Sequence, residues 1–169
     1  MSPSNRLILA LICFPFCLWG QVDSFLNQIN ELELVLQAAE DVNRTKEQAE
    51  TYIALIQSFA TSYPNEEKTP ELLFRAGDVS VGLKQYEQAI AIWDQLIQQY
   101  PEHTLHARSL FFKGFVFDTK LSDIERARTA YRLFLESYPE HELSATASLL
   151  LQQLGSTDQD LIEPHKKQN

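Results

Sequence analysis

Apolar positions recur along the chain at the spacing of one helix face. Three Tyr-Pro pairs stand at residues 63–64, 100–101 and 138–139, and apolar residues precede each tyrosine by four, seven and eleven positions. Such intervals return to the same side of an α-helix. The three columns hold Phe59, Leu96 and Phe134; Ile56, Trp93 and Tyr131; and Tyr52, Ala89 and Ala127. Because no segment shows sustained strand-like alternation, the pattern predicts an all-α protein.

The amino-acid sequence repeats with a period of 37 to 38 residues, since YPEHTLHA begins at Tyr100 and the similar YPEHELSA begins at Tyr138. Each Tyr-Pro pair should end a helix, because proline lacks the N–H that continues the ladder. Thr69, followed by proline, is expected to open a helix, and capping-box spacing begins at Thr45 and Ser122. The predicted helices span residues 24–41, 45–62, 70–83, 86–99, 103–120, 123–137 and 142–154.

Each repeat is therefore a pair of helices, and a pair this short must stack on the next one to bury its apolar stripe. Small residues are expected where helix backbones approach closely, at Gly77, Ala89, Gly114 and Ala127. Large side chains are expected to fill the spaces between pairs at native packing density, at Tyr86, Trp93, Tyr131 and Phe134.

The spacing of glycine, alanine, aromatic residue and proline resembles the tetratricopeptide repeat. The fitting sets are Gly77, Ala89, Trp93 and Pro101, then Gly114, Ala127, Tyr131 and Pro139, with a looser set at Tyr52, Ile56 and Pro64. The resemblance covers about residues 25–155, with units near 26–64, 65–101 and 102–139, a capping helix at 142–154 and a polar tail at 156–169. It implies antiparallel helix pairs stacked as a short right-handed superhelix, an α-solenoid.

The resemblance also implies a function, because tetratricopeptide proteins bind protein segments on the concave face of their first helices. By motif position that face would hold Glu71, Phe74, Asp78, Arg108, Phe111, Phe115 and Asp118. An alternative for Phe74 and Phe111 is burial against the neighbouring unit. Phe115 is the preferred anchor, because residues 110–117 carry more apolar surface than one helix seam needs.

The N-terminal segment has a different character. Arg6 precedes an apolar run at residues 7–19, which is shorter than the roughly 20 residues of a membrane-spanning helix. We interpret residues 1–20 as a signal peptide, with cleavage after Gly20 or after Ser24 both open, and a retained anchor as the alternative. The mature protein is then expected in the periplasm, with outer-membrane association left open and any membrane contact indirect or through this segment.

Both cysteines, Cys13 and Cys17, lie in this segment, so a cleaved chain would have no thiol chemistry. The long repeat period is more similar to envelope tetratricopeptide proteins of Gram-negative bacteria. These include the outer-membrane assembly lipoprotein and the periplasmic coordinator of the Tol-Pal system. The chain departs from them in having Phe16, not a small residue, before Cys17, and in lacking a long N-terminal coiled coil.

Charge and the available motifs reduce the number of functional classes to consider. With 14 basic and 23 acidic residues the formal charge is −9, which argues against nucleic acid as a partner. His103 and His141 hold equivalent places in successive repeats and His106 lies one turn away, so we expect turn contacts from these side chains, and no metal site. Without a recognised catalytic or phosphate-binding motif, we expect no cofactor, no small-molecule substrate and no enzymatic activity.

Two functional hypotheses remain. The first is an envelope adaptor that holds a protein partner. The second is a structural protein that self-associates through a heptad seam at Phe25, Ile29, Leu32, Leu36 and Ala39. In the alternative interpretation, this seam packs within the chain, on the helix that follows it. Residues 21–67 carry nine acids and two bases, so this part of the chain is the expected site for a basic partner or for self-association.

Overall fold

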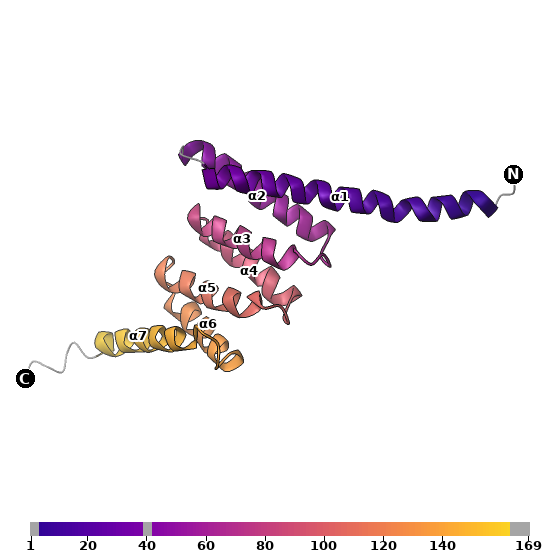
Figure 1. Cartoon of the computed structure of the whole chain (residues 1–169). Coiled ribbons are helices and arrows are strands. Elements are labelled where there is room, and N and C mark those ends of the chain that lie inside the picture. The colour runs from indigo at the N-terminus through magenta and orange to yellow at the C-terminus, as the bar shows by residue number, and fades with distance from the viewer. Residues whose placement is uncertain (1–3, 39–41, 163–169) are drawn as a thin grey trace, which may run out of the picture. The chain divides into compact units, whose positions relative to one another are not determined.

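A computed structural model describes the backbone of residues 4–38 and 42–162, and the side chains of residues 20–38 and 45–155. Seven helices make up most of these residues, and no strand occurs among them (Figure 1). They are α1 (Ser4–Ala38), α2 (Val42–Ser62), α3 (Thr69–Gly82), α4 (Tyr86–Gln99), α5 (Leu105–Thr119), α6 (Ile124–Ser137) and α7 (Ser144–Ile162). The predicted all-α class of paired helices is confirmed for this part of the chain.

The chain forms two compact units, unit 1 at residues 1–69 and unit 2 at residues 70–169. In unit 1, α1 packs against α2. Ile29 of α1 is fully buried, and the Phe25 ring lies 6.0 Å from Phe59 and 5.8 Å from Tyr63, centroid to centroid. The Tyr63 hydroxyl also donates to Gln21 Oε1 at 3.3 Å. The proposed heptad seam is thus used within the chain, at least at Phe25 and Ile29, while Ala39 lies outside the described residues.

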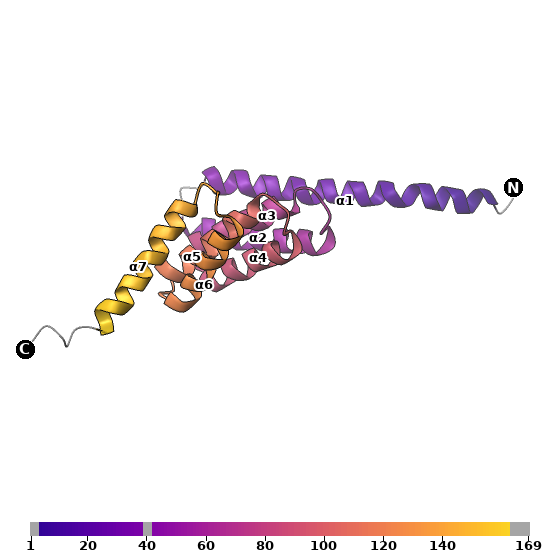
Figure 2. The ribbon, with the colours of Figure 1, turned by 90° about the horizontal axis from the view of Figure 1, so that it is seen from below.

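In unit 2, helices α3 to α6 lie side by side in both views, and α7 follows against α6 (Figures 1 and 2). Trp93, Tyr131 and Phe134 are each at most 1% exposed, as predicted for the side chains between helices, whereas Tyr86 is only half-buried. Ala89 and Ala127 are fully buried. Small residues face large ones at these contacts, which lets the helix backbones approach closely.

The two glycines of the repeat lie directly against aromatic rings. A Cβ atom on Gly77 would come within 2.2 Å of Trp93 Nε1, and one on Gly114 within 3.0 Å of the Tyr131 ring. Trp93 Nε1 donates to the Phe74 carbonyl oxygen at 3.3 Å, which fixes the indole in this position. The predicted close approach at both glycines is confirmed.

The second helix of each pair ends at its Tyr-Pro sequence, as predicted. Helices α2, α4 and α6 stop one residue before Tyr63, Tyr100 and Tyr138. The carbonyl oxygen of each tyrosine then accepts the N–H of the residue three positions on. The hydroxyl groups of Thr69 and Ser144, six residues after a tyrosine, donate back to that tyrosine's carbonyl at 2.8 and 2.6 Å. The same backbone hydrogen bond therefore closes the turn after each of the three Tyr-Pro sequences.

Several predicted helix ends were wrong. The helix predicted at 24–41 begins at Ser4, and α2 begins at Val42, so Thr45 lies inside the helix and not at its cap. At α6 the cap is Asp123, whose carboxylate accepts the Arg126 N–H at 3.0 Å. Ser122 has a φ of 53°, a left-handed conformation that an N-cap residue does not adopt.

The last helix is longer than the predicted 142–154, since α7 continues to Ile162. The prediction ended too early because the sequence after residue 154 has no apolar periodicity. At the other end, both expected cleavage positions fall within α1, and the signal peptide stays a prediction. Within the described ranges, no helix is long and apolar enough to cross a membrane.

Candidate functional site

The seven residues predicted to bind a partner come from α3 and α5, and the structure divides them by exposure. Glu71, Asp78 and Arg108 are exposed, while Phe115 and Asp118 are half-buried. Phe74 and Phe111 are only 7% and 5% exposed. We call the accessible set, together with Phe112, the α3–α5 face; it comprises Glu71, Asp78, Arg108, Phe112, Phe115 and Asp118.

Phe111 is a core residue of the α5–α6 pair. Its ring centroid lies 5.7 Å from that of Phe134 and 6.0 Å from that of Tyr131, both on α6. Phe74 is buried beside Trp93 at 6.3 Å and Phe112 at 6.0 Å. Of the two interpretations open from the sequence, burial therefore holds for both phenylalanines, and neither offers its ring freely to a partner.

Phe115 lies one turn after Phe111 and stacks on it, with centroids 6.4 Å apart and ring planes 18° from parallel. Because Phe115 is half-buried, one part of its ring rests on the core while another part reaches the surface. Aromatic side chains held in this way can contact a partner without a large loss of conformational freedom. The sequence-based preference for Phe115 over Phe111 agrees with this placement, while its binding role stays a prediction.

Arg108 links the two helices of the face. Its guanidinium carbon lies 5.2 Å from the centroid of Phe74 on α3 and 5.9 Å from that of Phe112 on α5. Such cation–π contacts hold the arginine along the aromatic surface. Phe112 was missed as a site residue, although it lies four positions after Arg108 and thus on the same side of the helix.

Two carboxylates border the aromatic residues. Desolvation raises the pKa of Asp78 to about 6, although part of this residue reaches solvent, and the positive charge of Arg108 opposes the rise. Asp118 accepts a hydrogen bond from the Tyr131 hydroxyl at 3.3 Å. The pKa of Tyr131 is raised, first by burial and then by the negative charge of Asp118. The face thus combines aromatic surface with charges of both signs.

The repeated histidines make turn contacts, as predicted. His103 Nδ1 accepts the N–H of Leu105 at 3.2 Å, and His141 Nδ1 accepts that of Leu143 at 3.1 Å. His106 Nδ1 hydrogen-bonds with the Tyr138 hydroxyl at 2.7 Å, and burial lowers the pKa of this histidine, with Glu102 opposing. In the described part of the chain, no group of three His, Cys, Asp or Glu residues is placed to hold a metal ion.

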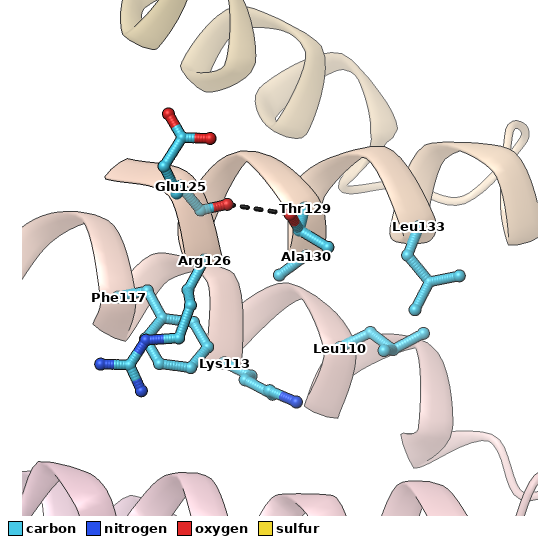
Figure 3. Close-up of a pocket in the computed structure, with 8 residues that line it drawn as sticks. All are labelled: Leu110, Lys113, Phe117, Glu125, Arg126, Thr129, Ala130 and Leu133. Carbon is cyan, nitrogen blue, oxygen red and sulfur yellow. Dashed lines mark hydrogen bonds between the residues drawn. The ribbon is translucent and has the colours of Figure 1, made fainter. Parts of the chain in front are cut away.

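A pocket of about 290 Å³ between α5 and α6 was not predicted from the sequence (Figure 3). In Figure 3 the Arg126 side chain lies across Phe117, and its guanidinium carbon is 4.5 Å from the ring centroid. Arg126 also pairs with Glu87 of α4 at 3.7 Å, and Lys113 pairs with Asp94 of α4. The lining residues are Leu110, Lys113, Phe117, Glu125, Arg126, Thr129, Ala130 and Leu133.

Two of the lining side chains, Lys113 and Arg126, form ion pairs with α4, and local sequence patterns do not show such long-range pairs. The apolar run at 110–117 indicated more hydrophobic surface on α5 than one helix contact needs. It did not predict that Arg126 and the 48% exposed Leu133 of α6 would line a pocket with these residues. Its two basic side chains already have acidic partners, so the pocket offers no uncompensated charge that would select a ligand.

Comparison with known proteins agrees with the architecture of α3 and α4. Residues 71–103 match the tetratricopeptide repeat family. The match contains the Gly77–Trp93 contact, and the α5–α6 pair repeats it as Gly114 against Tyr131. A search of curated proteins found no match for this sequence. Repeats of this kind form extended binding surfaces and are, as a rule, interaction modules and not enzymes.

Proposed function

We propose that this protein, which carries a tetratricopeptide repeat at residues 71–103, is a non-enzymatic scaffold of the bacterial cell envelope. It holds a segment of a protein partner on the α3–α5 face of unit 2. The observation that carries the proposal is the pairing of half-buried aromatic rings, Phe112 and Phe115, with the exposed charges of Asp78 and Arg108.

The chemistry of this face defines the partner segment. Apolar side chains of the partner would cover Phe115 and Phe112, whose rings are already held by Phe111 and Phe74 beneath them. An acidic group of the partner would approach Arg108, and a basic or amide group would approach Asp78. Interfaces with a rigid aromatic centre and a charged rim are typical of peptide recognition.

The proposed location rests on the apolar run at residues 7–19, which follows Arg6 and has the length of a signal-peptide core. Cleavage after residue 20 or 24 would leave unit 2 intact and remove both cysteines. Fractionation of the native cells followed by N-terminal sequencing tests this directly. A protein that keeps Met1 in the envelope would be anchored, and a protein found in the cytoplasm would exclude the envelope role.

The binding role is tested by Phe115→Ala in the full chain. The variant should lose the partner that cross-linking captures from the native envelope, while its melting temperature stays close to that of the wild type. Leu149→Ala is the matched control, because Leu149 is 55% exposed on α7 and outside the face. This variant should keep the cross-link.

Phe111→Ala provides the opposite comparison. Removing a buried phenylalanine costs about 3–5 kcal/mol, so this variant should lose stability first and binding only as a consequence. If Phe115→Ala destabilises the protein as much as Phe111→Ala does, then Phe115 is a core residue and the proposed face is wrong. If Phe115→Ala keeps the cross-link, the partner binds elsewhere.

A further inference from the structure

A second surface lies in unit 1, where a pocket of about 310 Å³ opens between α1 and α2. On α1 its lining residues are spaced by three and four positions, so they form one stripe along the helix. Val35 in this stripe is 40% exposed, and the adjacent Leu34 is 66% exposed. The lining residues are Gln28, Glu31, Leu32, Val35, Thr51 and Leu55.

Val35 of this pocket is not part of the buried contact between α1 and α2. That contact is made by the buried Ile29 and by Phe25, which lies against Phe59 and Tyr63. Val35 therefore stays accessible after the two helices have packed. The volume is at the lower end of the range for ligand pockets, about 300–1,000 Å³, and suits a few side chains better than a large molecule.

The one charged residue among the residues that line the pocket is acidic. Glu31 is part of the lining, and Glu47 lies one turn before Thr51, whose hydroxyl donates to the Glu47 carbonyl at 2.9 Å. Residues 21–67 contain nine acids and two bases, and one of those bases, Lys46, already pairs with Glu50 at 3.9 Å. An apolar pocket with acidic edges favours an occupant that carries apolar and basic groups together.

We infer that this pocket, the α1–α2 pocket, docks a basic amphipathic segment of a protein partner. Leucine-like side chains of that segment enter between Leu32, Val35 and Leu55. Lysine or arginine side chains on its flanks lie toward Glu31 and Glu47. This surface belongs to unit 1 and does not depend on the α3–α5 face of unit 2.

Charge disfavours the other occupants. An anionic lipid surface or a nucleic acid would bring negative charge against Glu31 and Glu47. A second copy of this chain carries the same net charge of −9, so its approach is opposed at low ionic strength. A basic segment is therefore favoured over all three.

The test uses the full chain and a designed, fluorescein-labelled peptide of 18 residues with leucine on one helix face and lysine on the other. Fluorescence anisotropy at 150 mM salt should show binding that weakens as salt increases. The same peptide with glutamate in place of lysine should bind at least tenfold more weakly. Val35→Ser and the double variant Glu31→Lys/Glu47→Lys should each weaken binding of the lysine peptide at least tenfold.

Leu149→Ser is the matched control, since it removes an exposed apolar side chain from unit 2 and should leave binding unchanged. Three results would overturn the inference. They are equal binding of both peptides, equal loss for Leu149→Ser and Val35→Ser, and an oligomer that Val35→Ser dissociates in sedimentation. The last result would assign the pocket to a second copy. Circular dichroism of Val35→Ser should match the wild type, because the residue is on the surface.

Discussion

The contact between Gly77 and Trp93 is the tightest that the structure shows for a glycine, and it predicts a large effect for Gly77→Ala. The added Cβ would lie 2.2 Å from Trp93 Nε1, 2.6 Å from Cε2 and 2.7 Å from Cδ1. Trp93 is only 1% exposed, so the indole cannot swing into solvent to make room. The ring must shift within a packed core.

Three contributions set the magnitude. Overpacking a core costs about 1–3 kcal/mol. A shift of the indole also breaks the hydrogen bond from Trp93 Nε1 to the Phe74 carbonyl, which leaves buried groups unpaired at a cost of about 1–3 kcal/mol. The better helix propensity of alanine returns about 1 kcal/mol. We therefore expect Gly77→Ala to lower the free energy of unfolding by about 1–5 kcal/mol, with a central value of about 3 kcal/mol.

Two glycines of the same unit are graded controls. A Cβ on Gly114 would lie 3.0 Å from Tyr131, which is a smaller overlap. The cost of this overlap should nearly cancel the stabilisation that alanine brings through its higher helix propensity. A Cβ on Gly82, at the end of α3, would have no atom within 4 Å, so Gly82→Ala should be neutral or stabilise by up to about 1 kcal/mol. The expected order of stability is Gly82→Ala, Gly114→Ala, then Gly77→Ala.

Urea unfolding followed by circular dichroism measures the three free energies. In a Trp19→Phe background, Trp93 fluorescence reports on the indole, and its emission should move to longer wavelength in Gly77→Ala. The cycle with Trp93→Leu should show coupling of at least about 1 kcal/mol, because leucine leaves space for the new methyl group. Equal stability of Gly77→Ala and Gly82→Ala would refute the packing argument.

The remaining predictions concern charge and capping. Because the pKa of Asp78 is raised to about 6 from an ordinary value of 3.8, the folded state binds this proton more tightly than the unfolded state does, and stability falls as pH rises between these values. Asp78→Asn should therefore stabilise by about 1 kcal/mol at pH 7.5, a figure reduced for solvent screening, and the gain should vanish near pH 4 in thermal unfolding. A gain independent of pH would contradict this. Asp123→Ala should destabilise the protein through loss of the α6 cap, measured by the same urea unfolding. Ser122→Gly should stabilise by about 1 kcal/mol in urea titration because φ is 53°, and a loss instead would mean that the serine side chain is needed in the turn.

Much of the fold was predictable because its signals are local. The columns before each Tyr-Pro pair mark one helix face, and proline ends a helix whatever surrounds it. The helix at 86–99 was predicted to the residue, and the turn contacts of His103 and His141 followed from their equivalence in the repeat. The helix starts were less accurate, since Asp123 and Ser122 are both plausible caps until the backbone conformation decides between them.

The candidate site was less predictable, because exposure is not a local property. Periodicity placed Phe74, Phe111, Phe112 and Phe115 on α3 and α5, but it does not measure how much of each ring the neighbouring helices cover.

By itself, the sequence determined the helical class, the repeat length, the Tyr-Pro helix ends and the small residues at helix contacts, because these depend on spacing and on the chemistry of single residues. Only the tertiary structure decided that Phe74 and Phe111 are buried while Phe115 reaches the surface. It also placed Arg108 over rings from two helices and raised the pKa of Asp78. These outcomes depend on distances between residues far apart in the chain, and packing sets those distances once the helices have come together.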